Sequence, residues 1–316
     1  MGSGQSTLPF VVRILWYSTS NFAKPILCSY SDPKLGILTL TPNSSSSEIE
    51  STQGSDPYDM LKQYKTWQEN RRIKQMGFTP AQWEDAVADW PVMQRYEGIE
   101  REALRDITFR FLVRKSFVPG RGFQFTDAMC IKIATMACVP ILHLGLDWYD
   151  RWYSMILYEG DFNPGRPYRS ADGVVHDKGP GLSGEAWHRG PVILSWDAVR
   201  KTGPHARHGK ASNVVIHELA HKLDMLRNNA QGAPPLHPDM RPGEWHEIFT
   251  TAWQKLEKDW HHHKPLPLDE YALTNPAEFF AVCSETFFEA PDHMQTTMPE
   301  VYRLLCQFYR QQPAAG

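Results

Sequence analysis

Apolar residues recur at helical spacing in three stretches of the chain. They appear every three or four residues over 99–113, which predicts an amphipathic helix. Residues 123–146 are apolar enough for a helix buried on most sides, and Pro140 is where such a helix should bend or end. A third amphipathic pattern covers 213–226, where Ser212 or Asn213 can act as N-cap.

Two short apolar runs, 153–158 and 191–196, have the length and the flanking Gly, Pro or Asp residues of strands. The residues between them are rich in Gly, Pro and Asp and predict a long irregular loop or hairpin. A Pro- and Asn-rich loop and two or three helices follow the helix at 213–226. The sequence therefore predicts an α+β fold, mostly helical, with a small sheet beside that helix.

The N-terminal part of the chain carries weaker signals. Residues 1–57 include four consecutive serines at 44–47, and this composition predicts a disordered leader. Residues 58–89 are polar and helix-permissive, without an apolar stripe, and predict a helical extension outside the core. We expect the globular domain to span residues 90–313, beginning near Trp90.

Composition narrows the possible functions. The chain has 316 residues, 41% of them hydrophobic, which is enough for a sizeable core. Its formal net charge of -3 lacks the basic excess of nucleic-acid-binding proteins, and no apolar run is long enough for a transmembrane helix. The 5 cysteines include no CxxC pair and fit a reducing compartment. We therefore expect a cytoplasmic protein that contacts neither nucleic acid nor membrane directly.

The segment His217-Glu218-Leu219-Ala220-His221 carries the strongest chemical signal. Its two histidines are four residues apart, so they project from one face of a helix and can share one Zn²⁺ at about 2.0–2.1 Å. Glu218 lies one residue round the helix, where its carboxylate can act as general base on a water molecule at the metal. The alternative is two incidental histidines and a surface glutamate. The position of the motif in an amphipathic helix just after a strand favours the metal site.

A catalytic zinc site needs a third protein ligand and an open coordination position. Asp224 lies on the same face, but seven residues beyond His217 it is about 10.5 Å along the helix axis and too far to share the metal. It can orient His221 or be an ordinary surface aspartate. The three consecutive histidines at 261–263 point in different directions on a helix and predict a solvated helix end.

A later helix offers two candidates for the third ligand, Glu278 and Glu285. Asn275 as N-cap and Pro276 at the first position mark its start. Glu278 is three residues after the cap, where it can instead bond the backbone of the cap, and Glu285 faces roughly the same way two turns later. Periodicity leaves both open. Tyr271 can donate a hydrogen bond to an oxyanion near the zinc, or simply anchor its loop.

From about residue 90 to residue 313 the chain resembles the Mlc titration factor A (MtfA) family of zinc-dependent peptidases. The segments that carry the resemblance are FVP at 117–119, VPIL at 139–142, LGLDW at 144–148, GPVILSW at 190–196, VIHELAHKLD at 215–224, DEYA at 269–272 and NPAEFFAV at 275–282. They stand in the order in which the family has them.

The resemblance implies a gluzincin-like site, similar to that of the catalytic domain of anthrax lethal factor. The residues that it implies are His217, His221 and Glu278 as ligands of one Zn²⁺ per chain, Glu218 as general base, and Tyr271 as an assisting group. It thereby places Glu278 above Glu285 as the third ligand. It further implies aminopeptidase-type activity on small peptide substrates, and binding of the glucose-responsive repressor Mlc, which relieves repression of the sugar phosphotransferase system.

Two alternatives remain beside a zinc peptidase. One is a protein that sequesters a transcriptional repressor and has only incidental peptidase activity. The other is a structural zinc site, which would not need Glu218. For the peptidase, we expect residues 192–196 to form an edge strand that aligns an extended peptide by main-chain pairing.

Overall fold

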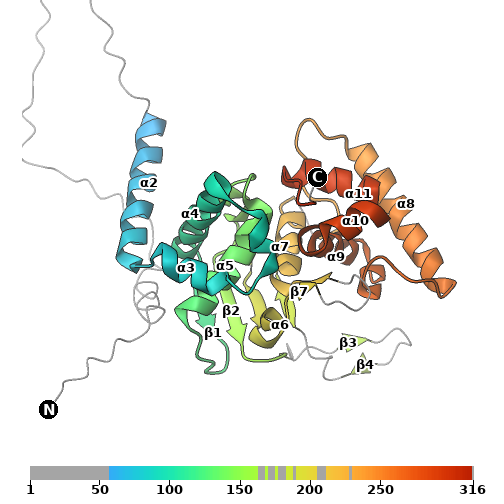
Figure 1. Cartoon of the computed structure of the whole chain (residues 1–316), viewed down its shortest axis with the longest axis horizontal. Coiled ribbons are helices and arrows are strands. Elements are labelled where there is room, and N and C mark those ends of the chain that lie inside the picture. Colours follow the sequence, from blue (N-terminus) through green and yellow to red (C-terminus); the bar gives the residue numbers. More distant parts are fainter. Residues whose placement is uncertain are drawn as a thin grey trace, which may run out of the picture.

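The computed structural model describes residues 57–162, 168–169, 175–176, 183–187, 190–204, 211–227 and 230–314. The predicted disordered leader lies outside the described residues, apart from its last one. In the described part helices predominate around a small sheet (Figure 1), so the predicted α+β class is confirmed. None of the described helices combines the length and apolarity needed to cross a bilayer.

The helices are α2 (Pro57–Met76), α3 (Pro80–Val87), α4 (Gly98–Arg114), α5 (Asp127–Cys138), α6 (Trp196–Arg200), α7 (Val214–Asp224), α8 (Pro242–His261), α9 (Pro276–Glu289), α10 (Pro291–Thr297) and α11 (Pro299–Tyr309). Short 3-10 helices are η1 (Pro91–Arg95), η2 (Val139–Ile141), η3 (Leu146–Tyr149) and η4 (Glu270–Leu273). The strands are β1 (Ser116–Pro119), β2 (Ser154–Tyr158), β3 (Tyr168–Arg169), β4 (Val175–His176), β5 (Gly184–Ala186), β6 (Val192–Ser195), β7 (Gly203–Pro204) and β8 (Ala211–Ser212).

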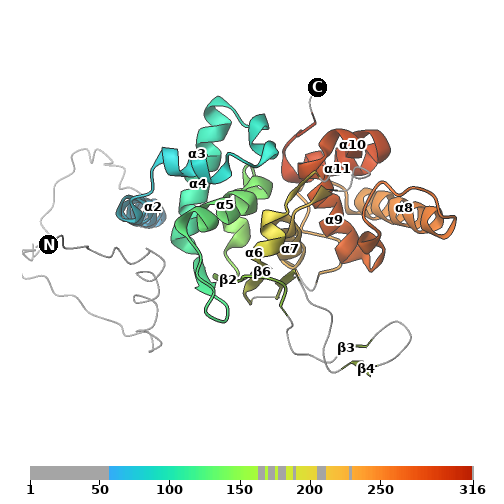
Figure 2. The same cartoon turned by 60° about the horizontal axis from the view of Figure 1, so that its bottom comes forward.

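Helix α7 lies at the centre of the molecule. Figures 1 and 2 show α2 to α5 on one side of it and α8 to α11 on the other. Most of its apolar residues, such as Leu219 and Leu223, are fully buried. The predicted helix at 99–113 is α4, and the predicted helix at 123–146 ends early, as α5 and then η2, because Pro140 interrupts it.

The four-stranded sheet has the order β1-β2-β6-β5. Strands β1, β2 and β6 are parallel, whereas β5 is antiparallel to β6 and lies at the edge. All four residues of β6 are buried. The expectation that residues 192–196 form an edge strand is therefore wrong, because β5, in the segment just upstream, folds back as a hairpin and covers that edge.

The packed core begins earlier than the sequence pattern indicated. Trp83 and Val87 of α3 are fully buried, and Trp83 Nε1 donates to Thr135 Oγ1 of α5 at 3.0 Å. Trp83 and Val87 are one turn apart in a short, otherwise mostly polar helix. The buried face of α3 therefore rests on two residues, too few to form an apolar stripe in the sequence. The region at 58–89 is helical as predicted, but α3 belongs to the core.

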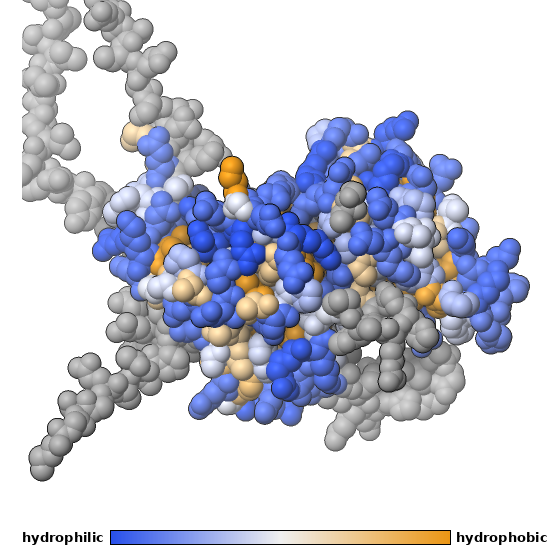
Figure 3. All heavy atoms as spheres, in the orientation of Figure 1, coloured by the Kyte–Doolittle hydropathy of each residue, from blue (hydrophilic) through white to orange (hydrophobic). Residues whose placement is uncertain are grey.

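Helix α2 reaches the core only near its end, through Met76 and Ile73, and polar contacts hold its middle. Glu69 bonds both Arg110 and Arg114 of α4, at 3.3 Å and 2.7 Å, while Trp67 is 55% exposed. Elsewhere, on the face seen in Figure 3, polar residues predominate and apolar ones form small groups between them. This is the pattern of a domain whose apolar positions are largely turned inward.

Replacing Trp83 with Ala should lower the free energy of unfolding by about 3–5 kcal/mol, because it removes a fully buried aromatic side chain. Urea titration of the full chain measures this loss. Trp67→Ala is the matched control, since it removes the same side chain from an exposed position and should cost about 0.5 kcal/mol. Equal losses for the two variants would show that α3 is not part of the core.

Candidate metal centre

Helix α7 begins at a well-formed cap. The side-chain Oδ1 of Asn213 accepts a hydrogen bond from the backbone N–H of Ile216 at 3.0 Å, so Asn213 is the N-cap that the sequence left open between two residues. From there His217 and His221, one turn apart, both face α9. Strand β8 ends directly before this cap.

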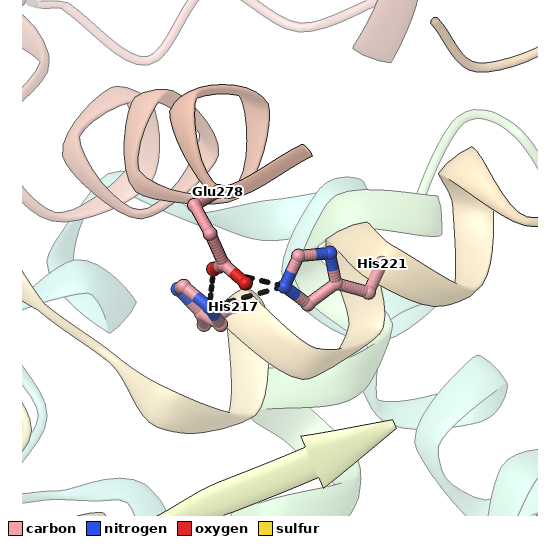
Figure 4. A group of neighbouring side chains, drawn as sticks. All are labelled: His217, His221 and Glu278. Atoms are coloured by element: carbon pink, nitrogen blue, oxygen red, sulfur yellow. Dashed lines mark hydrogen bonds and ion pairs between the residues drawn. The ribbon is translucent and has the colours of Figure 1, made fainter. Parts of the chain in front are cut away.

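Figure 4 shows Glu278 reaching from the first turn of α9 toward both imidazoles. Its Oε2 lies 2.9 Å from His217 Nε2 and 3.2 Å from His221 Nε2, and the two nitrogens are 3.2 Å apart. Ligand atoms about 2.0–2.1 Å from a tetrahedral zinc ion lie roughly 3.3–3.4 Å from one another. The three side chains are thus nearly at the mutual distances that one zinc ion requires.

Among the described residues this is the one group of three or more His, Cys, Asp or Glu side chains close enough to share a metal ion. Two imidazoles and one carboxylate also form a donor set typical of catalytic zinc, with a fourth position left for water. The histidines at 261–263 lie exposed at the end of α8, as predicted.

The cap of α9 leaves Glu278 free to face the histidines. Asn275 Oδ1 accepts from the backbone N–H groups of Ala277 and Glu278, at 2.9 Å and 3.1 Å. The alternative, in which Glu278 bonds the backbone of the cap, is not adopted. Its carboxylate bonds the two imidazoles instead.

Glu285 lies on the other side of His217. Its Oε1 is 2.7 Å from His217 Nδ1, and its Oε2 accepts from the backbone N–H of Asn213 at 2.6 Å. A proton on Nδ1 is directed at this carboxylate, so Nε2, which faces Glu278, is the nitrogen that could bind a metal ion. Glu285 is therefore placed to orient His217 rather than to join the group that could hold a metal ion.

The charges around His217 and Glu278 favour a positive charge between them. Burial tends to lower the pKa of His217, but the negative charge of Glu285 and hydrogen bonds with Glu278 and Glu285 raise it well above its usual value. Burial tends to raise the pKa of Glu278, but hydrogen bonds from His217 and His221, and their charge, hold it at about 2. A metal cation between these groups would satisfy the same electrostatic demand.

Glu218 is buried beside this group and faces the sheet rather than α9. A Cβ atom added to Gly184 of β5 would lie 2.4 Å from Glu218 Oε1, so the carboxylate lies directly against that strand. Burial raises the pKa of Glu218 to about 7, against the opposing influence of His217 and His221. A carboxylate in such a place can accept and release a proton near neutral pH.

Tyr271 lies in η4, beside the first histidine. Asp269 Oδ1 accepts from its backbone N–H at 3.0 Å, and its ring centre is 5.9 Å from that of His217. Its side chain is half exposed. Burial of its hydroxyl and the nearby carboxylates, Glu278 first among them, raise the pKa of Tyr271 to about 12. The phenol therefore stays protonated and can donate.

Asp224 fits neither role that the sequence suggested. It is buried, and its carboxylate accepts from the backbone N–H groups of Gln231, Gly232 and Ala233 at 2.6–2.8 Å. These donors fix the loop that follows α7. No hydrogen bond of the described residues joins Asp224 to His221, so the sequence analysis was wrong here.

Sequence reasoning also missed three residues that hold the centre in place, namely Glu285 as an orienting group, Gly184 and Lys222. Lys222 Nζ donates to the carbonyl oxygens of Trp187 and Gly190, at 2.6 Å and 2.8 Å, and so ties α7 to the β5–β6 hairpin. The seven-residue spacing from Glu278 to Glu285 did show that both share a face of α9. It could not show that they lie on opposite sides of one imidazole.

Comparison with known proteins points to a metallopeptidase family. A family model described as glucose-regulated metallo-peptidase M90 matches residues 64–310. "Mlc titration factor A" of Escherichia fergusonii is 33% identical over 233 residues, which cover 73% of this chain and 86% of that protein. The protein of the same name from Klebsiella pneumoniae subsp. pneumoniae is 33% identical over 235 residues, covering 74% and 87%. The predicted resemblance is confirmed, and the chain belongs to the M90 family of glucose-regulated metallo-peptidases.

Proposed function

We propose that this metallopeptidase is a zinc-dependent enzyme that hydrolyses peptide bonds with Glu218 as general base. One observation carries this proposal: His217, His221 and Glu278 converge on one point, and the buried carboxylate of Glu218 directly follows His217 on α7. Zinc, when bound there, would supply Lewis-acid activation of water and of the scissile carbonyl group. One ion per chain fits the site.

The protein side chains supply the proton transfers. Glu218 takes the proton of the attacking water and passes it to the leaving amine. Tyr271 donates a hydrogen bond to the oxyanion that develops on the substrate carbonyl. Its half-exposed position beside His217 supports this role, since the group must be reachable from solvent and from the site at once.

The substrate should lie along β5. This strand is the outermost one on its side of the described sheet, and its first residue lies against the carboxylate of Glu218. An extended peptide added to that edge by main-chain pairing would pass beside the base. We propose small peptides and aminopeptidase-type cleavage as substrate and mode, on the strength of the resemblance to the MtfA family.

The two glutamates of α9 should differ in their effect on zinc. Glu278→Gln removes a ligand, whereas Glu285→Gln removes only the acceptor that orients His217 and should weaken zinc binding by about 10–100-fold. Competition with a chromophoric chelator measures both affinities. Glu300→Gln, at an exposed position in α11, is the control and should bind zinc like the unaltered chain. A larger loss for Glu285→Gln than for Glu278→Gln would reverse the assignment.

Replacing Glu218 with Gln should lower kcat of a chelator-sensitive peptidase assay by about 10²–10⁴-fold, because the general base is lost. The variant should keep one zinc ion per chain, since Glu218 is not a ligand, and metal analysis of the purified protein checks this. Stripping zinc from the unaltered chain should abolish activity, and adding zinc should restore it. Full activity of a zinc-loaded Glu218→Gln variant would disprove the mechanism.

A second candidate function is capture of an Mlc-like repressor, which the name of the relatives favours. We expect capture to survive the double change His217→Ala and His221→Ala, because the side chains of both residues are nearly buried and offer little surface to a protein partner. A pull-down with purified repressor measures this. If capture disappears while the variant remains folded, the two functions share the metal centre.

A further inference from the structure

Gly184 opens strand β5 although its backbone does not require a glycine. It is not among the glycines with positive φ, and glycine at a strand position forfeits side-chain packing and costs conformational entropy. A glycine of this kind often marks a place where another group approaches the backbone closely. Here the approaching group is the carboxylate of Glu218.

The space beside Gly184 is already filled. A Cβ atom at this position would lie 2.4 Å from Glu218 Oε1, 2.8 Å from Glu218 Cγ and 2.7 Å from a methyl carbon of Val214. All three distances are below 3.0 Å, which real Cβ atoms essentially never show. The carboxylate of Glu218 therefore occupies the space that a side chain at position 184 would need.

The strand cannot easily move away to make more room. Lys222 follows Glu218 by four residues on the same face of α7, and its Nζ donates to the carbonyl oxygens of Trp187 and Gly190. These two residues lie in the connection between β5 and β6. The hairpin is therefore fixed to α7 one turn beyond the base, so a side chain at position 184 would displace the flexible carboxylate first.

We propose that Gly184 is a positioning residue for the general base: the bare backbone of β5 sets where the carboxylate of Glu218 stands relative to the histidines. This inference rests on the proposed role of Glu218. It assigns two different supports to the centre, since α9 positions the metal ligands and the β5–β6 hairpin positions the base.

Gly184→Ala is the direct test. Restoring an ordinary contact distance of about 3.4 Å would move Glu218 Oε1 by about 1 Å, and a misplacement of that size can cost about 100-fold in rate. We expect kcat to fall by about that factor, with one zinc ion still bound per chain and KM changed less than about threefold. Gly243→Ala in α8 is the matched control, because nothing lies within 4 Å of its added Cβ atom.

A double-mutant cycle separates positioning from a merely structural effect. Glu218→Asp shortens the base by one methylene group and withdraws the carboxylate from the added methyl group. In the Gly184→Ala background, Glu218→Asp should therefore cost at least about tenfold less in kcat than in the unaltered chain. If the two substitutions lower kcat independently, so that their fold-losses multiply in the double variant, the proposal is overturned. Loss of zinc from the Gly184→Ala variant would overturn it as well.

If Gly184→Ala does not fold, the double variant Gly184→Ala and Val214→Ala removes the clash with Val214 and keeps the one with Glu218. Its kcat should still fall relative to Val214→Ala alone. An unchanged kcat would overturn the positioning role. The general mechanism would still stand if Glu218→Gln is inactive, so the two failures are distinguishable.

Discussion

The centre depends on the packing of α9 against α7, which is made specific by buried polar groups. Glu285 takes hydrogen bonds from the backbone N–H of Asn213 and from His217 Nδ1 with its two oxygens. Glu289, one turn later, accepts from Asn213 Nδ2 at 2.7 Å and from Trp90 Nε1 at 2.9 Å. A buried polar group without a partner costs free energy, so these contacts favour this register between the helices. In that register Glu278, two turns before Glu285, lies over both imidazoles.

The same packing gathers more negative than positive charge. Glu218, Glu278 and Glu285 surround His217 and His221, and every one of these side chains is largely buried. Burying several carboxylates together is unfavourable unless a cation accompanies them. A protonated imidazole can provide that positive charge. A zinc ion would provide more of it, bound by unprotonated imidazole nitrogens. Metal binding and the stability of this region should therefore be linked.

The sequence was most informative where local physics decides the outcome. Helical spacing located α4 and α7, Pro140 marked the end of α5, and Asn275 with Pro276 marked the start of α9. It failed where distant segments decide. Whether 192–196 is an edge depended on whether a Gly-rich segment folds back to pair with it. The role of Asp224 depended on three backbone amides of the following loop, whose composition predicted a loop but not its path.

The segment from His217 to His221 on α7 faces two neighbouring elements of the fold. His217 and His221 face α9, while Glu218 and Lys222, each one residue further round, face the β5–β6 hairpin. A rotation of about 100° per residue separates the two pairs. The proposed ligands and the proposed base are therefore supported by different elements, which pack against two different faces of α7. Changes in α9 should act first on the metal, and changes in the hairpin should act first on proton transfer.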